Sequence, residues 1–360
     1  APYQQEKKMC DIIDLTKKLE AKFPHEVIYK IQKLDDLQRR YFIITLLNKV
    51  TEKTRWVIYD VGPDSALSAD DKHHSPSAGL DSGEFKGEIT MTKEYTEKLF
   101  WALREKDAEA DAVASCTLPL CTDAKILFTL DSWLNDTIIE ELSPSLANNR
   151  VAFILKEQLG AFVKSCSLEK NDDDYCDRQD HQEYYKIHAN GDIYTLGSLR
   201  DGILLYGDKG KDFMFTSSAD AQGGKVFALP EDTHTASLAR LAPTVSQLFL
   251  VKDERNQQNQ KVAGLFFFDL KTGSLHKLDT LATNALQIIM IGMVQGKIYT
   301  VYRVDKEPSL PYYFKKEVGK KEEMIGAGQG WFGEAKQMQN GKALAIDIYK
   351  NKIASFECIP

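Results

Sequence analysis

The chain of 360 residues is 43% hydrophobic, which suffices to bury a core and excludes a globally disordered protein. Its net charge is −7, with acidic and basic residues mixed along most of its length. This balance disfavours a nucleic-acid binder, which should concentrate basic residues on one face, and electrostatic docking on anionic lipid. No apolar run reaches the ~18 residues that a membrane-spanning helix requires.

The first part of the chain predicts a helix followed by strands. Apolar residues recur at helical spacing over residues 5–22, so we expect an N-terminal helical segment within residues 1–25. Pro24 ends the pattern because proline cannot continue a helix. Residues 26–61 then hold three strand-like runs, which together predict a first sheet unit.

The next segment, residues 62–123, predicts an insertion. Residues 64–89 are rich in Ser, Asp, Gly and His, which indicates a long surface loop. Residues 92–112 are expected to form a surface helix with a solvated charged face. Strands resume over residues 124–182, which predict a second sheet unit and an acidic loop over 169–180.

From residue 183 onward the pattern becomes regular. The Gly-x-Ile-Tyr-Thr run at residues 191–195 returns at 296–300, a separation of 296 − 191 = 105 residues. Hairpin-like pairs follow, and residues 262–278 are the clearest, with an apolar run, Asp269, a Thr-Gly turn and a second strand. Units of about 40–50 residues with roughly four short strands are typical of β-propeller blades.

We therefore predict a mainly all-β protein, a single β-propeller domain over residues 1–360 whose ring closes near the C-terminus. Two blades are expected before residue 183 and four over residues 183–360, giving six in total. Five or seven blades remain open, and a pair of β-sandwiches is the competing architecture.

Six cysteines suit disulfides, because their number is even and none forms the C-x-x-C pair typical of zinc or thioredoxin-like sites. The expected pairs are Cys116–Cys121, Cys166–Cys176 and Cys10–Cys358, the last joining the two ends of a closed ring. Six buried free thiols are the alternative. The start at Ala1, without an initiating Met, is consistent with a removed signal peptide, and Asn135 is the one glycosylation sequon. The prediction is a secreted glycoprotein.

Several runs resemble the yellow and major royal jelly proteins of insects. Residues 55–62 resemble that family's Trp-Val-x-Asp-x-Gly strand, and residues 201–203, 213–218 and 225–229 look like its Asp-Gly-Ile blade. Residues 264–267 are similar to the opening strand of a later blade. Thr54 stands where the family has a cysteine, and the Asp60 strand carries an extra residue. The resemblance implies a secreted six-bladed propeller without established catalysis, whose relatives in blood-feeding insects bind biogenic amines in the channel.

A small ligand of a propeller is expected in its central channel, where few polar groups converge among apolar walls. An amine would require a carboxylate and an aromatic face. Candidates on the predicted inner strands and adjoining loops are Tyr194, Asp201, Tyr299, Tyr302, Trp331 and Phe332. Each also has an ordinary interpretation, since tyrosine in a strand is usually packed and aspartate before glycine usually forms a turn.

An enzyme is the second class of function. A propeller hydrolase, such as a glycosidase or phosphoesterase, would require two or three carboxylates at the channel mouth, working as acid and base or holding calcium. Aspartates end many strand-like runs, at positions 60, 131, 253, 269, 305 and 347. No Gly-x-Ser-x-Gly or His-Glu-x-x-His motif occurs.

Metal binding is expected to be absent, with calcium as the one possible exception. His73-His74 has no third ligand nearby in the sequence, and the acidic loop lacks the spacing of an EF-hand. The third class of function is a protein-interaction module that binds a host protein or receptor. We expect a monomeric, secreted, non-enzymatic protein that binds a small ligand or an extracellular protein, with no nucleic acid and no membrane insertion.

Overall fold

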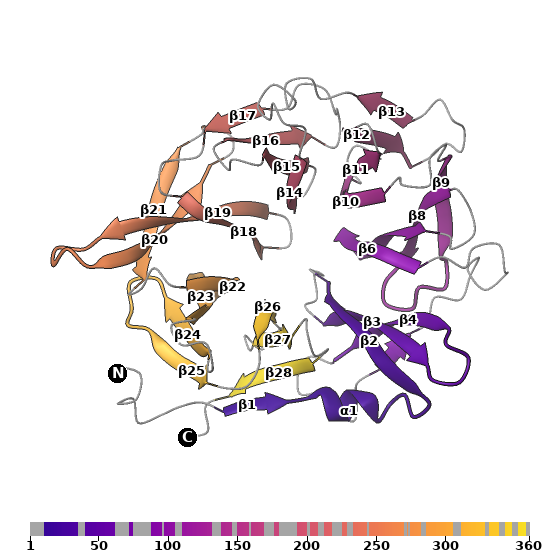
Figure 1. Ribbon diagram of the computed structural model, residues 1–360, viewed down its shortest axis with the longest axis horizontal. Helices are drawn as coiled ribbons and strands as arrows, with labels where there is room; N and C mark the ends of the chain where they lie inside the picture. The colour runs from indigo at the N-terminus through magenta and orange to yellow at the C-terminus, as the bar shows by residue number, and fades with distance from the viewer. Residues whose placement is uncertain are drawn as a thin grey trace.

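The computed structural model describes residues 11–34, 40–61, 72–74, 88–95, 97–104, 110–131, 138–145, 150–157, 160–168, 176–179, 193–199, 202–207, 212–217, 225–228, 233–242, 245–269, 272, 274–281, 286–304, 311–327, 331–337, 343–347 and 352–357. The strands of these residues form seven four-stranded antiparallel sheets arranged as blades in a ring (Figure 1).

The blades follow one another in chain order. Blade 1 contains β2 (Glu26–Lys33), β3 (Tyr41–Asn48), β4 (Thr54–Asp60) and β5 (Lys72–His74). Blade 2 contains β6 (Glu88–Tyr95), β7 (Lys98–Arg104), β8 (Ala110–Thr117) and β9 (Lys125–Asp131). Blade 3 contains β10 (Ile138–Ser145), β11 (Arg150–Glu157), β12 (Gly160–Ser167) and β13 (Cys176–Gln179). Blade 4 contains β14 (Ile193–Leu199), β15 (Gly202–Gly207), β16 (Asp212–Ser217) and β17 (Lys225–Ala228).

Three blades complete the ring. Blade 5 contains β18 (Thr233–Ala242), β19 (Val245–Arg255), β20 (Lys261–Phe268) and β21 (Leu275–Leu281). Blade 6 contains β22 (Leu286–Val294), β23 (Lys297–Val304), β24 (Tyr312–Glu317) and β25 (Glu323–Ala327). Blade 7 contains β26 (Phe332–Gln337), β27 (Ala343–Asp347), β28 (Lys352–Glu357) and, from the other end of the chain, β1 (Asp11–Asp14).

The propeller prediction is confirmed, but the expected six blades are one too few. Four blades do lie between residue 183 and the C-terminus, as predicted. The extra blade is blade 2, which occupies residues 88–131. We expected an insertion over 62–123 and a surface helix over 92–112, and both expectations are wrong.

The error at β7 has a physical cause. Leu99, Phe100, Trp101 and Ala102 are all at most 1% exposed, because neighbouring blades cover both faces of the sheet. A strand buried on both faces has a continuous apolar run rather than alternation, and such a run cannot be told from a buried helix by periodicity alone.

The predicted N-terminal helix is also corrected. Residues 11–14 form the strand β1, and α1 spans only Thr16–Glu20. β1 pairs with β28, and the backbone N–H of Leu15 donates to the carbonyl oxygen of Ile353 at 2.8 Å. The first described strand of the chain is therefore the outermost strand of the last blade, and this pairing closes the ring.

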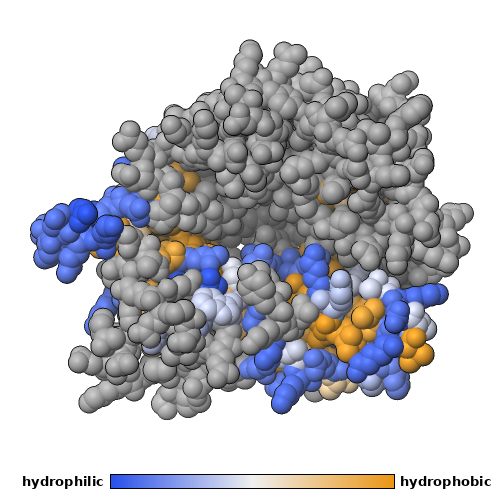
Figure 2. All heavy atoms as spheres, in the orientation of Figure 1, coloured by the Kyte–Doolittle hydropathy of each residue, from blue (hydrophilic) through white to orange (hydrophobic). Residues whose placement is uncertain are grey.

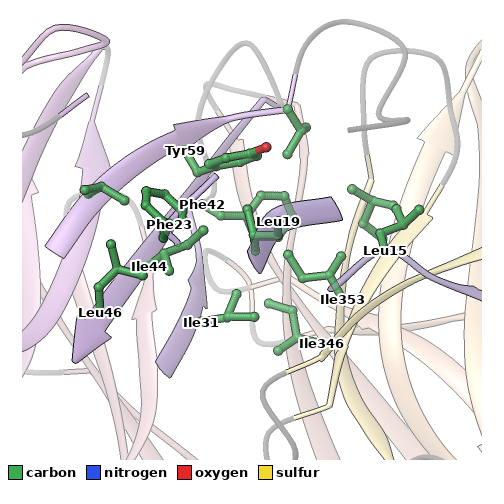
Figure 3. Close-up of a cluster of buried hydrophobic side chains, with 13 residues drawn as sticks. Leu15, Leu19, Phe23, Ile31, Phe42, Ile44, Leu46, Tyr59, Ile346 and Ile353 are labelled. Atoms are coloured by element: carbon green, nitrogen blue, oxygen red, sulfur yellow. The ribbon is translucent and has the colours of Figure 1, made fainter. Parts of the chain in front are cut away.

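A hydrophobic cluster seals the seam between blades 7 and 1 (Figure 3). Leu15, Leu19 and Phe23, from α1 and its flanks, are buried in it. Blade 1 contributes Ile31, Phe42, Ile44, Leu46, Val57, Tyr59 and Val61, and blade 7 contributes Leu344, Ile346 and Ile353. The N-terminal segment thus adds both a strand and a core to the closure.

A polar contact joins blades 6 and 7 nearer the axis. The side-chain amide of Gln337 accepts from the backbone N–H of Met293 at 3.2 Å and donates to its carbonyl oxygen at 3.0 Å. The side-chain amide of Gln337 therefore makes the same pair of hydrogen bonds with the Met293 backbone that a residue of a neighbouring strand would make. Gly292 makes room for it, since a Cβ there would lie 2.7 Å from Gln337 Oε1 and from the Tyr299 ring.

The cysteines of two of the three predicted disulfides lie in the described part of the chain. The Cys116–Cys121 bridge is confirmed, with an S–S distance of 1.98 Å. Cys166 is disulfide-bonded and lies directly opposite Cys176 in the strand register, in agreement with the predicted pair. Cys10 and Cys358 lie outside the described residues, as does Asn135.

Truncation of Leu19 should weaken the seal. We expect Leu19→Ala to lower the free energy of unfolding by about 2–5 kcal/mol, because it leaves a cavity in a fully buried cluster. Denaturant unfolding checks this. Val50→Ala is the control, since Val50 is 88% exposed and its truncation should change stability by less than about 0.5 kcal/mol. Equal effects of the two substitutions would contradict the seal.

A pair of glycine substitutions tests the contact between blades 6 and 7. Gly292→Ala should destabilise the protein by about 1–3 kcal/mol, because the added methyl group displaces the amide of Gln337 or the ring of Tyr299. Gly333→Ala is matched to it, since a Cβ at Gly333 meets no atom within 4 Å. Thermal unfolding of both variants tests this expectation. Similar melting temperatures would show that the contact between blades 6 and 7 does not contribute to stability.

Asp14 gives ring closure a dependence on pH. Burial raises its pKa, but hydrogen bonds from the Thr16 backbone and hydroxyl and the nearby Lys352 ammonium outweigh it, so the pKa of Asp14 lies below its ordinary value. A depressed pKa in the folded state adds stability at neutral pH, and this is lost as pH falls below about 4. Asp14→Asn should therefore destabilise at pH 7 and progressively less toward pH 3, measured by denaturant midpoints. A difference independent of pH would contradict this.

Candidate active site at the inner strands

The innermost strands surround the axis of the ring. The strands β6, β10, β14, β18, β22 and β26 each pack against the next, so the first strand of each of these blades lies nearest the axis. β2 has the same place in blade 1, and Lys33 at its end donates to the Ala335 carbonyl oxygen of β26 at 3.5 Å. The space-filling view shows a hollow at the centre of the ring, with described hydrophilic residues beside it (Figure 2).

Every innermost strand carries a β-bulge close to its start. In each, one residue is skipped in the pairing with the second strand of the blade. The skipped residues, in blade order, are Tyr29, Thr90, Glu140, Leu196, His234, Ile289 and Gly333. We call this set the bulge ring. It lies toward the end of the channel where each innermost strand begins.

A bulge interrupts the alternation of side chains and re-aims one of them, and bulges are over-represented beside active sites. Three members of the bulge ring carry chemistry, namely Tyr29, Glu140 and His234. Glutamate and histidine are residue types that acid–base catalysis uses, and the register places Glu140 and His234 at corresponding bulges of blades 3 and 5. Sequence reasoning missed these residues because a bulge appears only when the strand register is known.

Two neighbouring residues on the innermost strand of blade 1 are exposed. Tyr29 is 59% exposed and Lys30 is exposed, while Ile31 beside them is buried. Glu334, one residue after the bulge in β26, is also exposed.

Two of the predicted ligand-binding residues lie at the seam of blades 6 and 7. Phe332 is buried, and its backbone N–H donates a hydrogen bond to Tyr313 Oη at 3.0 Å. Trp331 is half-buried beneath the Arg303 guanidinium, whose carbon lies 5.1 Å from the ring centroid. Arg303 also donates to the Phe332 carbonyl oxygen at 3.2 Å and to the side chain of Gln287. These contacts of Arg303, on β23, with Trp331 and Phe332 join blades 6 and 7.

The other candidates are placed separately. Tyr299 and Tyr302 lie on β23, the second strand of blade 6, and both are buried. Tyr302 donates to Glu322 and stacks on Phe314 at 5.5 Å, whereas Lys315 lies 4.5 Å from the Tyr299 ring. Tyr194 is in β14, and Asp201 lies outside the described residues. Tyr299 shares a buried cluster between blades 6 and 7 with Phe332, whereas Tyr302 lies in the cluster between blades 5 and 6.

The carboxylates at strand ends do not gather in the described residues. Asp60 is buried and forms a double hydrogen bond with Arg40, at 2.9 and 2.8 Å. Asp347 is buried at the end of β27 in another blade. His73 and His74 lie in β5. Within the part of the chain that is described, no three His, Cys, Asp or Glu side chains are placed to hold a metal ion. The expectation of no bound metal, with calcium as the one exception, remains a prediction.

One described serine–histidine pair has hydrogen-bonding geometry. Ser274 Oγ lies 3.2 Å from His276 Nε2 and 2.5 Å from Thr272 Oγ1. The pair follows the turn from β20 to the outermost strand β21, where Asp269 N–H donates to the Ser274 carbonyl oxygen at 2.9 Å. His276 and Thr272 are exposed, so the three side chains secure a turn and lack the enclosure of an active site.

Comparisons with known proteins agree on the fold. No family model and no curated protein matches the chain, so the resemblance to the insect family remains a prediction. An oligogalacturonate lyase solved with manganese is 8% identical, with a TM-score of 0.57, and the match covers 91% of this chain and 88% of the lyase. Prolyl oligopeptidase B from Galerina marginata is 8% identical with a TM-score of 0.54, and an acylaminoacyl peptidase is 8% identical with 0.52.

The match covers 96% of this chain in the oligopeptidase and 91% in the acylaminoacyl peptidase, but only 53% and 50% of those proteins. The chain thus spans about half of each peptidase. These likenesses show the propeller fold alone. The expectation of a non-enzymatic small-ligand binder is corrected, because these three solved propellers, with TM-scores above 0.5, belong to enzymes and agree better with the hydrolase alternative. Among the described residues no helix is long and apolar enough to cross a membrane.

Proposed function

We propose that this protein is a hydrolase that binds and cleaves its substrate at the end of the central channel where the inner strands bulge. The observation that supports the proposal is the bulge ring, in which Glu140, His234 and Tyr29 hold corresponding register positions on three innermost strands. The propellers of peptidases and of a lyase support an enzymatic role.

The chemistry assigned to the two groups is general acid–base hydrolysis. One group accepts a proton from water as the water oxygen bonds to the electrophilic carbon of the substrate. The other donates a proton to the leaving oxygen or nitrogen as its bond to that carbon breaks. The water therefore supplies a hydroxyl group to one product and a hydrogen to the other. Positioned groups of this kind contribute ~10²–10⁴-fold in rate.

The proposal includes an extracellular location. The Cys116–Cys121 bridge and the disulfide of Cys166 support it, because structural disulfides persist in oxidising compartments. Neither disulfide is required for the chemistry proposed at the axis. The effect of the two disulfides is to hold the outer strands of blades 2 and 3.

The test is an activity screen of the purified chain against chromogenic glycosides, carboxylic esters and peptides, with calcium or with chelator. We expect turnover of one class, and Glu140→Gln and His234→Asn should each lower kcat by about 100-fold or more. Gln258→Ala is the control, because Gln258 is exposed in the hairpin between β19 and β20 at the rim of the ring (Figure 1). Its kcat should equal that of the unaltered protein.

Two results would overturn the proposal. One is the absence of turnover in the whole panel, with and without calcium. The other is turnover that survives both substitutions, which would place the catalytic groups elsewhere. Thermal unfolding of each variant must match that of the unaltered protein, so that a loss of activity is not a loss of folding.

A further inference from the structure

We propose that residues Tyr29, Lys30 and Gln32 of β2 form a substrate subsite for the carboxylated sugar unit of an acidic oligosaccharide. This inference rests on the proposed hydrolase function and names its substrate class. The three residues belong to the innermost strand of blade 1, where Tyr29 and Lys30 are exposed and Gln32 is half-buried.

The bulge makes two consecutive residues of β2 available to a ligand. In a regular strand, neighbours point to opposite faces, and one of each pair would be covered by a blade. Here Ile28 pairs with Leu46, Lys30 pairs with Thr45, and Tyr29 between them has no partner in the register. The result is a phenol ring 59% exposed directly beside an exposed ammonium group.

Gln32 adds an observation that points to a ligand independently. Its Oε1 atom is buried and has no hydrogen-bond partner, although buried acceptors are almost always satisfied. Gln32 lies two residues after Lys30, and side chains at that spacing share a face of the strand. Gln32 as a whole is only half-buried, and its unsatisfied amide oxygen is an acceptor for a ligand hydroxyl group held beside Lys30.

The three groups match three features of a uronic acid ring. The apolar face of a sugar stacks on an aromatic ring, its carboxylate pairs with an ammonium group, and its hydroxyls donate to an amide oxygen. An extended peptide is a poorer match, because it lacks a ring that holds an apolar face, a carboxylate and hydroxyl groups in one unit.

The height of the subsite agrees with the proposed catalytic level. Lys33 Nζ donates to the Ala335 carbonyl oxygen at 3.5 Å, which sets the height of β2 against β26. Lys30 lies three residues before Lys33, or roughly 10 Å toward the start of the strand. The bulge ring is at that end, so a sugar unit held at Lys30 would present the adjoining linkage to Glu140 and His234.

The test is binding, so that it does not depend on turnover. Cellobiouronic acid and cellobiose differ by one carboxylate, and their dissociation constants are measured by calorimetry on the Glu140→Gln variant. We expect tighter binding of the acid by about tenfold or more. Lys30→Gln should abolish that preference, and Tyr29→Ala should weaken both ligands. Lys261→Gln is the matched control, because Lys261 is exposed at the distant β19–β20 hairpin.

The outcomes separate the two proposals. Preference for the acid that depends on Lys30 supports the subsite even where no hydrolysis is found. Equal binding of both disaccharides, or a preference that survives Lys30→Gln, would overturn the proposed subsite. The hydrolase proposal would be unaffected, because the activity screen tests it separately. Binding of the acidic dipeptide Glu-Phe, with the same dependence on Lys30 and no binding of either sugar, would overturn the sugar assignment. Gln32→Leu should weaken both sugars, and an unchanged affinity would remove Gln32 from the subsite.

Discussion

The structure depends on one constraint, which is that no blade can bury both of its faces alone. Each four-stranded sheet is apolar on two sides, and only a closed ring gives every side a neighbour. The seam between the last blade and the first is the critical one, because nothing in the chain order brings these blades together. The N-terminal segment solves this by pairing β1 with β28 and by inserting Leu15, Leu19 and Phe23 into the gap. The cost of joining two distant chain ends is offset by a buried cluster that spans both blades.

Apolar burial holds the blades together, but it does not fix how each is turned against the next. Hydrogen bonds are directional, and several cross the seams. Lys316 and Asp279, both largely buried, join blades 5 and 6 at 2.6 Å. Gln337 joins blades 6 and 7, and buried Lys336 donates to the Tyr41 carbonyl oxygen at 2.6 Å between blades 7 and 1. Buried polar groups are costly unless satisfied, so these contacts favour one arrangement of the blades over neighbouring ones.

The fold could be predicted from the sequence where the signal for a strand or turn lay within a few neighbouring residues. The hairpin of residues 262–278 is present as β20 and β21, because an apolar run, an aspartate and a Thr-Gly turn act within a few residues. The count of blades failed where burial on both faces made β7 look helical. The repeated Gly-x-Ile-Tyr-Thr run was also misleading. Its first copy leads into β14, an innermost strand, whereas its second leads into β23, a second strand.

The candidate site could not be predicted, for a different reason. Tyr29, Glu140 and His234 share no sequence motif and lie in three blades, so only the register of strands that are distant in the chain relates them. The residues chosen from sequence were aromatic groups in strongly patterned strands, and strong patterning marks packing. Tyr302 and Phe332 are accordingly buried between blades. A propeller uses its regular residues to pack the ring, so chemistry at the axis falls to positions where the regular pairing is interrupted. In this chain those positions are the bulges.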